Sequence, residues 1–283
     1  MIATEEQPIA ANPTDWYQKS MQWAVRLLVA TVWTSALIFG LYIFVFYFLS
    51  SLQGEIAQWN EVLPDLYSED APAATLGIGI HFAAGSLILM LGCIQLIGRI
   101  RQSYPAVHRW LGRIYVVSAL VTGIGGLVFI FTKGTVGGLA MDIGFTGYGV
   151  LTIVAAIGAF HFARQRDFGR HRAWAIRLFA LAVGSWLYRM EYGFWFLFTD
   201  GLGHTSTFDG PFDQVMDFFF YLPNLLVAEV LIGRRKLFES KVAKTLATAG
   251  MVAASALLLV ATYFFTLKFW GPEIVQGLVA QSP

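Results

Sequence analysis

The chain has 283 residues, of which 57% are hydrophobic and only 13% are charged. A soluble domain of ordinary composition has about 25% charged residues, so these values indicate an integral membrane protein and exclude a disordered chain. The net charge of +1 gives no support to nucleic-acid binding, and the single cysteine, Cys93, excludes a disulfide framework.

Seven apolar segments follow one another along the chain. Each is long enough to cross a hydrocarbon core of about 30 Å, which takes about 20 residues of helix. Backbone groups find no hydrogen-bond partner in lipid, so helices are expected. The segments are 24–50, 76–98, 110–131, 143–163, 173–196, 213–233 and 246–270. The sequence therefore predicts an all-α, polytopic fold with a single membrane domain over residues 1–283, in which helices two to five form a central four-helix bundle.

Basic residues predict the orientation of this domain. Sixteen of the 19 Lys and Arg residues flank the start of the first segment and the connections that follow the second, fourth and sixth segments. All of these positions lie on one side of the membrane. By the positive-inside rule, the N-terminus is expected in the cytoplasm and the C-terminus outside, in a bacterial inner membrane.

Two short motifs begin the third and fifth helices. His108–Arg113 and His171–Arg177 both start with His-Arg and contain a Trp and a second Arg. Because both motifs lie at the cytoplasmic start of a helix, they are consistent with a parallel repeat about an axis along the membrane normal. They can equally arise because Trp, Arg and His all suit the membrane interface.

The histidines of these motifs are candidate ligands for one b-type haem. A bis-histidine haem needs two imidazoles that face each other across a bundle, and His108 and His171 occupy equivalent positions on alternate helices. His161 is the other candidate partner. The alternative is structural anchoring, in which these histidines and the adjacent Arg109 and Arg172 bind lipid headgroups.

A second group of polar residues lies near the outer ends of the helices. It comprises His81, Asp142, Arg189, Glu191 and Asp217. If these side chains converge, they can bind a quinone head or another small polar ligand. The alternative is an ion pair between Arg189 and a carboxylate that fixes helix packing. His204, in an outer loop, is expected to be solvated.

The sixth helix contains Pro223, Asn224 and Glu229. Proline leaves a backbone carbonyl without its usual partner, and Asn224 can satisfy a carbonyl at this point. Glu229 is expected to pair with one of the nearby arginines, Arg164, Arg172 or Arg177, and a role in proton relay is the alternative.

These motifs resemble a known bacterial membrane family. His81, the stretch His108-Arg109-Trp110-Leu111-Gly112-Arg113-Ile114-Tyr115, the motif His171–Arg177 and the later Pro223–Glu229 are similar to the family called domain of unknown function 2306. The resemblance covers about 75–235 and leaves the flanking helices 24–50 and 246–270 outside. Ala175 departs from the family's pattern, which has Met there. The resemblance implies an architecture but no reaction.

The helix number and the histidines also give a looser likeness to the ascorbate-reducible, two-haem cytochrome b family. The function that the sequence favours is transmembrane electron transfer through one haem b or a quinone. The alternatives are transport or binding of a small ligand by the outer polar group, and an accessory subunit of a larger assembly. The only partner that composition itself implies is the lipid bilayer.

Overall fold

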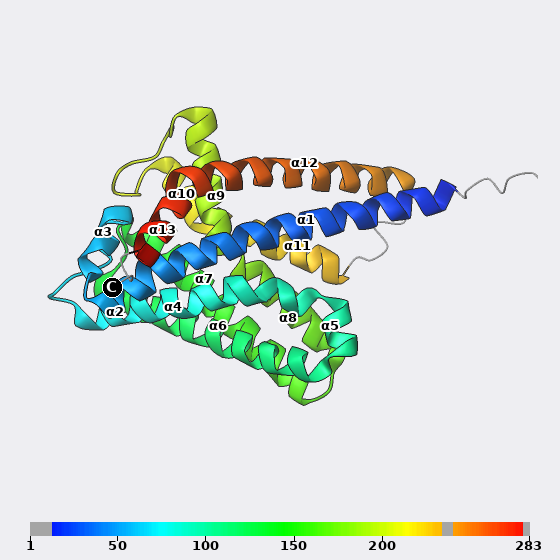
Figure 1. The fold of residues 1–283 in the computed structure, drawn as a ribbon, viewed down its shortest axis with the longest axis horizontal. Helices are drawn as coiled ribbons and strands as arrows, with labels where there is room; N and C mark the ends of the chain where they lie inside the picture. The colour runs from blue at the N-terminus through cyan, green and yellow to red at the C-terminus, as the bar shows by residue number, and fades with distance from the viewer. Residues whose placement is uncertain (1–12, 234–239, 280–283) are drawn as a thin grey trace, which may run out of the picture.

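The structure is a computed structural model that describes residues 13–233 and 240–279, and it is helical nearly throughout (Figure 1). In chain order the elements are α1 (Pro13–Ile43), the π-helical turn η1 (Phe44–Leu49), α2 (Ser50–Gln53), the 3-10 turn η2 (Ile56–Gln58), α3 (Trp59–Val62), α4 (Pro72–Leu96), α5 (Gly98–Ser103), α6 (Pro105–Lys133), α7 (Gly138–Arg164), α8 (Phe168–Ala182), α9 (Gly184–Thr199), α10 (Pro211–Phe219), α11 (Leu222–Gly233), α12 (Lys241–Phe265), the π-helical turn η4 (Thr266–Trp270) and α13 (Gly271–Val279). The described residues contain no strand. The all-α prediction is confirmed.

Within the described ranges, six helical segments are long and apolar enough to cross a membrane. They are Trp16–Gln53, Pro72–Leu96, Pro105–Lys133, Gly138–Arg164, Pro211–Gly233 and Lys241–Val279. Each contains one of the predicted segments or nearly all of it. The chain is therefore a multi-pass membrane protein.

The predicted fifth helix, 173–196, is where the structure differs from the expectation of seven. It is divided at Val183 into α8 and α9, of 15 and 16 residues. In Figure 1, α9 turns away from the long direction of the molecule and runs across it. A β-carbon on Gly184 would lie only 3.4 Å from the carbonyl oxygen of Phe220, so the start of α9 is packed closely against the turn between α10 and α11. Hydropathy does not register such a break, because both halves are apolar.

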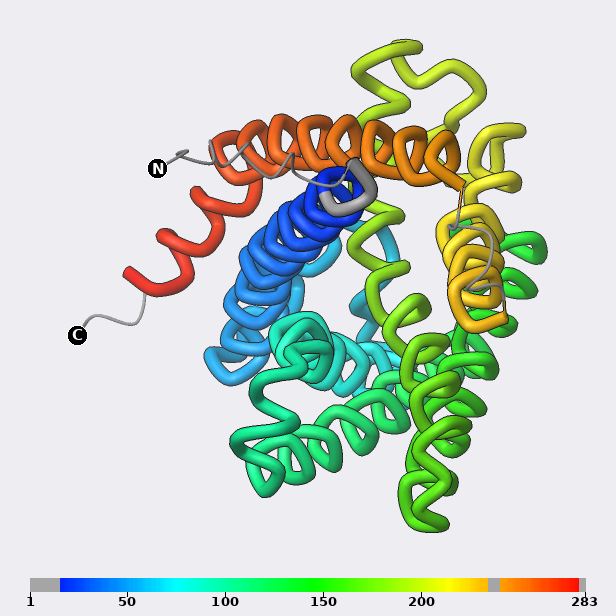
Figure 2. Tube along the Cα trace, turned by 90° about the vertical axis from the view of Figure 1, so that its right-hand side faces the viewer, coloured from blue at the N-terminus to red at the C-terminus, as the bar shows by residue number. Residues whose placement is uncertain are grey.

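Helices that follow one another in the chain pack side by side in the lower half of Figure 1. α4 lies along α6, α7 contacts both α6 and α8, and α8 returns to contact α4. α1 covers α4 from the other side. In Figure 2, α12 (orange) lies at the edge of the molecule against α1 (blue).

The molecule has two chemically different ends. We call the end that carries α5 and the connection 165–167 the basic end, since Arg99, Arg101, Arg109, Arg164, Arg166, Arg170 and Arg172 lie there. The opposite end carries the connections 63–71, 134–137 and 200–210, and we call it the acidic end because Asp65, Glu69, Asp70, Asp200 and Asp209 lie there. α1 begins at the basic end and α13 lies at the acidic end (Figure 1).

Two hydrophobic cores hold the helices together. One joins α1, α4, α9 and α12 around Trp186, and the other joins α4, α6, α7, α8, α9 and α10 around Leu181. Trp186 also donates its indole N–H to the Ser35 hydroxyl at 2.9 Å, which links α9 to α1. Because α4 and α9 contribute to both cores, the space between these cores is enclosed by several helices.

Candidate functional site

A cavity of about 200 Å³ lies between the two cores, towards the acidic end. On the same measure a single water molecule needs about 10–15 Å³, so the cavity can accept a small organic molecule. Aromatic and aliphatic side chains form most of its wall, among them Phe39, Ile78, Phe82, Phe129, Phe145, Tyr148, Tyr188 and Phe220. Few polar groups lie among them, which is typical of a ligand site.

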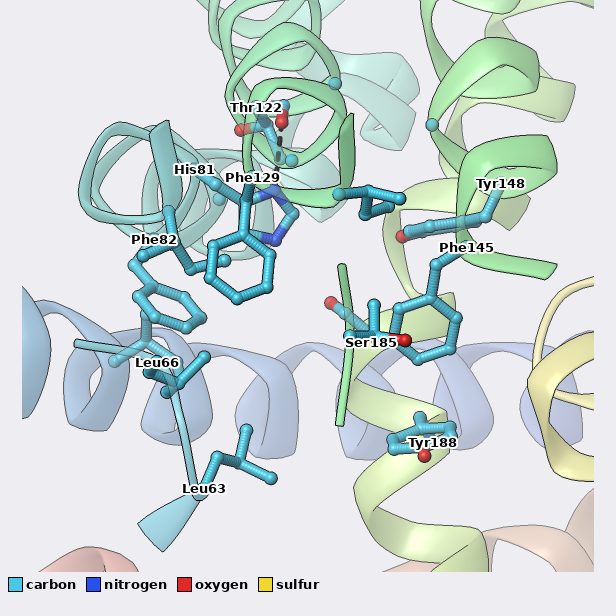
Figure 3. A pocket seen from close by; sticks show the side chains of 18 of the residues that line it. Leu63, Leu66, His81, Phe82, Thr122, Phe129, Phe145, Tyr148, Ser185 and Tyr188 are labelled. Carbon is cyan, nitrogen blue, oxygen red and sulfur yellow. Dashed lines mark hydrogen bonds between the residues drawn. The ribbon is translucent and has the colours of Figure 1, made fainter. Parts of the chain in front are cut away.

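His81 on α4 is the most informative polar group of the cavity wall. Its Nδ1 lies 2.9 Å from the backbone carbonyl oxygen of Thr122 on α6. A carbonyl can only accept, so Nδ1 carries the hydrogen and Nε2 of the neutral ring is left as an acceptor. Figure 3 shows the ring with this second nitrogen turned towards the interior of the cavity.

Arg189 on α9 lines the same cavity. Its guanidinium lies over the ring of Tyr188, with Cζ at 5.5 Å from the ring centroid. None of the ion pairs among the described residues includes Arg189, so the expected pair with a carboxylate is absent from this part of the chain. Arg189 therefore lines the cavity with no described carboxylate within 4 Å of its guanidinium.

Hydroxyl groups complete the polar part of the wall. Figure 3 places Thr122 beside His81, and Tyr148 and Ser185 across the cavity from it. Tyr148 donates its hydroxyl to the carbonyl of Leu181 at 2.8 Å, whereas the buried Thr122 hydroxyl has no hydrogen-bond partner among the described residues. The cavity thus offers one acceptor, one cation and several hydroxyls in an apolar surround.

The three acidic residues predicted for this site do not line the cavity. Asp142 accepts hydrogen bonds from the backbone N–H and the hydroxyl of Thr135, at 2.7 and 2.8 Å, and so fixes the turn before α7. Asp217 is fully buried against Gly144, and neither of its oxygens has a partner in the described chain. One oxygen of Glu191 is likewise buried without a partner there. The predicted outer group is therefore divided, and only His81 and Arg189 share the cavity.

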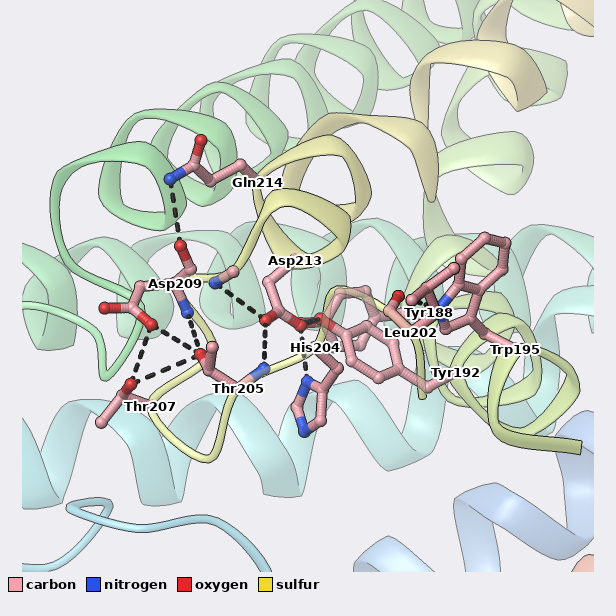
Figure 4. Close-up of polar contacts among 11 residues, drawn as sticks. Tyr188, Tyr192, Trp195, Leu202, His204, Thr205, Thr207, Asp209, Asp213 and Gln214 are labelled. Atoms are coloured by element: carbon pink, nitrogen blue, oxygen red, sulfur yellow. Dashed lines mark hydrogen bonds and ion pairs between the residues drawn. The ribbon is translucent and has the colours of Figure 1, made fainter. Parts of the chain in front are cut away.

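His204 is not a solvated loop residue, so that expectation was wrong. Its Nδ1 lies 2.7 Å from Asp213, a fully buried carboxylate that also accepts from the Tyr192 hydroxyl at 2.7 Å (Figure 4). Loop 200–210 folds back onto the start of α10, which the sequence pattern does not indicate. Farther out in this loop, the hydroxyls of Thr205 and Thr207 donate to Asp209 and hold its pKa below the ordinary value.

The histidines predicted as haem ligands lie at the basic end. His171 Nδ1 donates to the carbonyl of Ala159 at 2.9 Å, and the buried His108 Nδ1 has no partner in the described chain. The two imidazoles are near enough for their charges to interact, whereas His161 is exposed. No set of three or more His, Cys, Asp and Glu side chains in the described ranges is arranged to hold a metal ion.

The remaining predicted residues have structural partners or face outwards. Glu229 forms the expected ion pair with Arg177, whose Nη2 lies 2.9 Å from Oε2. Asn224 donates to the carbonyl of Phe220 at 2.7 Å, at the break between α10 and α11. Arg109 and Arg172 are exposed at the basic end, as an interfacial role requires.

Sequence reasoning missed Thr122, Tyr148, Ser185 and Tyr188, which all line the cavity. Thr122 could have been found from its spacing, because it lies seven residues after Tyr115 and fourteen after His108 on one helix face. The others carry no such signal, since a Tyr or Ser within an apolar helix is common.

No curated protein matches this chain, and no solved structure matches it. The family model described as "Predicted membrane protein (DUF2306)" matches residues 78–232, which is more than half of the chain. The match begins within α4 and ends within α11, so it includes every helix that surrounds the cavity except α1. The chain therefore belongs to this family of membrane proteins, as the motifs around His108, His171 and Pro223 predicted.

Proposed function

We propose that this protein binds a small amphipathic molecule in the cavity, with the head group between His81 and Arg189. The observation that carries the proposal is the guanidinium of Arg189, which lines an apolar cavity without a carboxylate partner in the described chain. Arg189 is half-buried, and a charge that is partly removed from water gains from a partner, so a ligand oxygen that accepts from Arg189 is favoured.

A quinone fits this chemistry. Its carbonyl oxygens can accept hydrogen bonds from Arg189 and Ser185, and its ring can pack among Phe129 and Phe145. The reduced form carries hydroxyl groups, one of which can donate to His81 Nε2. A fatty acid offers a carboxylate for Arg189 but no ring for the aromatic wall, which is why we favour the quinone.

The test is binding to the full chain in lipid nanodiscs, with decylubiquinone and decanoate as probes. We expect decylubiquinone to bind, and Arg189→Gln to weaken its binding at least tenfold, or by about 1.4 kcal/mol. Arg172→Gln is the matched control, because Arg172 is exposed at the basic end. Equal affinity in the Arg189→Gln and Arg172→Gln proteins would rule out the proposed head-group site.

We also propose the orientation and organisation of the domain in the membrane. The basic end faces the cytoplasm of a bacterium, the N-terminus lies inside and the C-terminus outside, and α8 with α9 completes the seventh crossing. The positions of α1 and α13 at opposite ends support an odd number of crossings (Figure 1). In this arrangement α4, α6, α7 and α8 form the central bundle of a single membrane domain.

A haem b between His108 and His171 is a second candidate, and it would give the protein a role in electron transfer. One observation favours it: the hydrogen bond from His171 Nδ1 to Ala159 leaves Nε2 free to bind iron. Neither of the two principal cavities includes either histidine in its lining. Expression with added haem followed by an absorption spectrum tests it. A Soret band that His171→Ala removes would support a haem, and a spectrum without that band would contradict it.

A further inference from the structure

Asp217 on α10 is a buried carboxyl group that the candidate site does not use. It is fully buried and does not line the cavity. Neither of its oxygens has a hydrogen-bond partner in the described chain, and none of the ion pairs there includes it. A carboxylate in such surroundings is costly, because a charge removed from water needs an opposite charge or several donors beside it.

Asp213, one helical turn earlier on the same face of α10, shows what an anion requires at this place. Its carboxylate is as deeply buried as that of Asp217, but it accepts hydrogen bonds from α9, from loop 200–210 and from the residue before α10 (Figure 4). One of these donors, His204, can also carry a positive charge. Asp217 has no such donor among the described residues.

The charges around Asp217 also disfavour a second anion. Those that act on it come from Asp213 and, on α7, from Asp142, and both would repel a carboxylate. Asp142 has its own donors, the backbone N–H and the hydroxyl of Thr135. On α9, Tyr188 is near enough to interact with Asp217, but a phenol brings no positive charge. Where acidic groups share a site in this way, one of them keeps its proton.

The contact with α7 leaves little room for another partner. A β-carbon on Gly144 would lie 3.0 Å from that of Asp217, so the backbones of α7 and α10 pack closely at this point. Both oxygens of Asp217 are buried. Among the described residues, no three or more His, Cys, Asp and Glu side chains are arranged to hold a metal ion. A proton needs neither added space nor further ligands.

We propose that Asp217 is a proton-binding site: its carboxyl group holds a proton at neutral pH, and this proton allows α10 to pack against α7. On release, the O–H bond breaks, the electron pair stays on the oxygen and the proton goes to water. Release would leave two anions one helical turn apart beside a tight backbone contact, and so favours separation of α10 from α7. In membrane helices, buried acidic residues commonly bind protons. The site does not depend on the proposed ligand, because Asp217 lies outside the cavity wall.

Infrared spectroscopy of the full chain tests whether the proton is present. The protein is held at neutral pH in dodecyl maltoside, a detergent without carbonyl groups, so that no lipid ester covers the carbonyl stretch of a neutral carboxylic acid. We subtract the spectrum of Asp217→Asn from that of the unchanged protein. The difference is expected to contain the carboxylic acid stretch. Carboxylate bands in its place would overturn the proposal.

Asp209→Asn is the matched control. Asp209 is exposed in loop 200–210, and the hydroxyls of Thr205 and Thr207 hold its pKa below the ordinary value, so it is a carboxylate at neutral pH. Its difference spectrum should contain carboxylate bands and no carboxylic acid stretch. The same acid stretch in both difference spectra would mean that the band does not come from Asp217, and would contradict the proposal.

Thermal unfolding tests whether the proton supports the contact with α7. A protonated Asp and an Asn are both neutral and similar in size, so Asp217→Asn should fold. In the unfolded chain Asp217 is in water and ionised, so a folded protein that holds the proton loses stability as the pH rises. We expect the melting temperature of the unchanged protein to fall by at least about 3 °C more than that of Asp217→Asn between about pH 5 and about pH 8.

The comparison isolates Asp217 because the other ionisable groups titrate alike in the two proteins. These groups are Asp213 on α10, Asp142 on α7, Tyr188 on α9 and His204, which contacts Asp213. Melting temperatures that fall in parallel would overturn the proposal.

Discussion

At the scale of single residues, the buried Asp213 is the best-supported polar group in the molecule. Its two oxygens accept from the side chains of Tyr192 and His204 and from the backbone N–H groups of Thr205 and Gly210, all within 3.0 Å (Figure 4). These donors come from α9, from loop 200–210 and from the residue before α10. Asp213 therefore ties the loop at the acidic end to two helices, which explains why so polar a group is tolerated in the interior.

This arrangement predicts a clear effect of His204→Ala. Removing the imidazole leaves a buried carboxylate one donor short, so we expect a loss of about 1–3 kcal/mol in the free energy of unfolding. Thermal or denaturant unfolding in detergent measures it. Ser206→Ala, at an exposed position in the same loop, should cost less than about 0.5 kcal/mol. Equal stability of the two variants would show that His204 does not support Asp213.

The ion pair between Glu229 and Arg177 should matter much less. Its side chains are 50% and 24% exposed, so water screens the attraction, and Glu229→Gln is expected to cost at most about 1 kcal/mol. An unfolding measurement on this variant decides the point. A loss of several kcal/mol would mean that Glu229 has a role beyond a surface pair.

At the scale of elements, the contact between α4 and α6 sets the geometry of the cavity. The two helices approach most closely where Gly77 faces Gly125: a β-carbon at Gly125 would lie 2.5 Å from the carbonyl oxygen of Gly77 and 3.0 Å from the backbone nitrogen of His81. Glycines at such crossings let helix backbones come together in membranes. The same crossing brings His81 within reach of the Thr122 carbonyl, so packing and site chemistry depend on the same two glycines.

Gly125→Ala should therefore disturb both the packing of α4 against α6 and the position of His81. The methyl group would meet backbone atoms that cannot move independently, so we expect α4 and α6 to separate, at a cost of about 1–3 kcal/mol. Affinity for decylubiquinone should fall at least tenfold because His81 moves with α4. Gly250→Ala, which meets no neighbouring atom, should keep both stability and binding. If Gly125→Ala binds the probe as the unchanged protein does, the crossing does not position His81.

At the scale of the whole molecule, the two ends differ in charge, and this difference predicts how the protein sits in the membrane. Introduced single cysteines can report the orientation of the protein. The natural Cys93 is buried, so it should not react with a large labelling reagent. Thr207→Cys, exposed at the acidic end, should be labelled by a membrane-impermeant maleimide on intact cells. Gln165→Cys, exposed at the basic end, should be labelled only after permeabilisation. The reverse pattern would invert the proposed orientation.

Composition and motif spacing alone predict the class, the family and most of the helices. Hydrophobic length decides these, since about 20 apolar residues in a row can be satisfied only by a helix across the bilayer. The sequence also identified His81 and Arg189 as polar residues at membrane depth, and it named Arg177 as one of three candidate partners of Glu229. These are local properties of composition and spacing, and they can be read without knowing how the helices pack.

Which polar residues meet depends on how the helices pack against one another. The sequence places Asp142 and Asp217 at about the depth of His81 in the membrane, yet neither lines the cavity. The direction of a side chain depends on how its helix is rotated against its neighbours. The break at Val183 and the fold of loop 200–210 onto Asp213 have the same origin. They result from contacts between segments far apart in the chain, which hydropathy and motif spacing do not record.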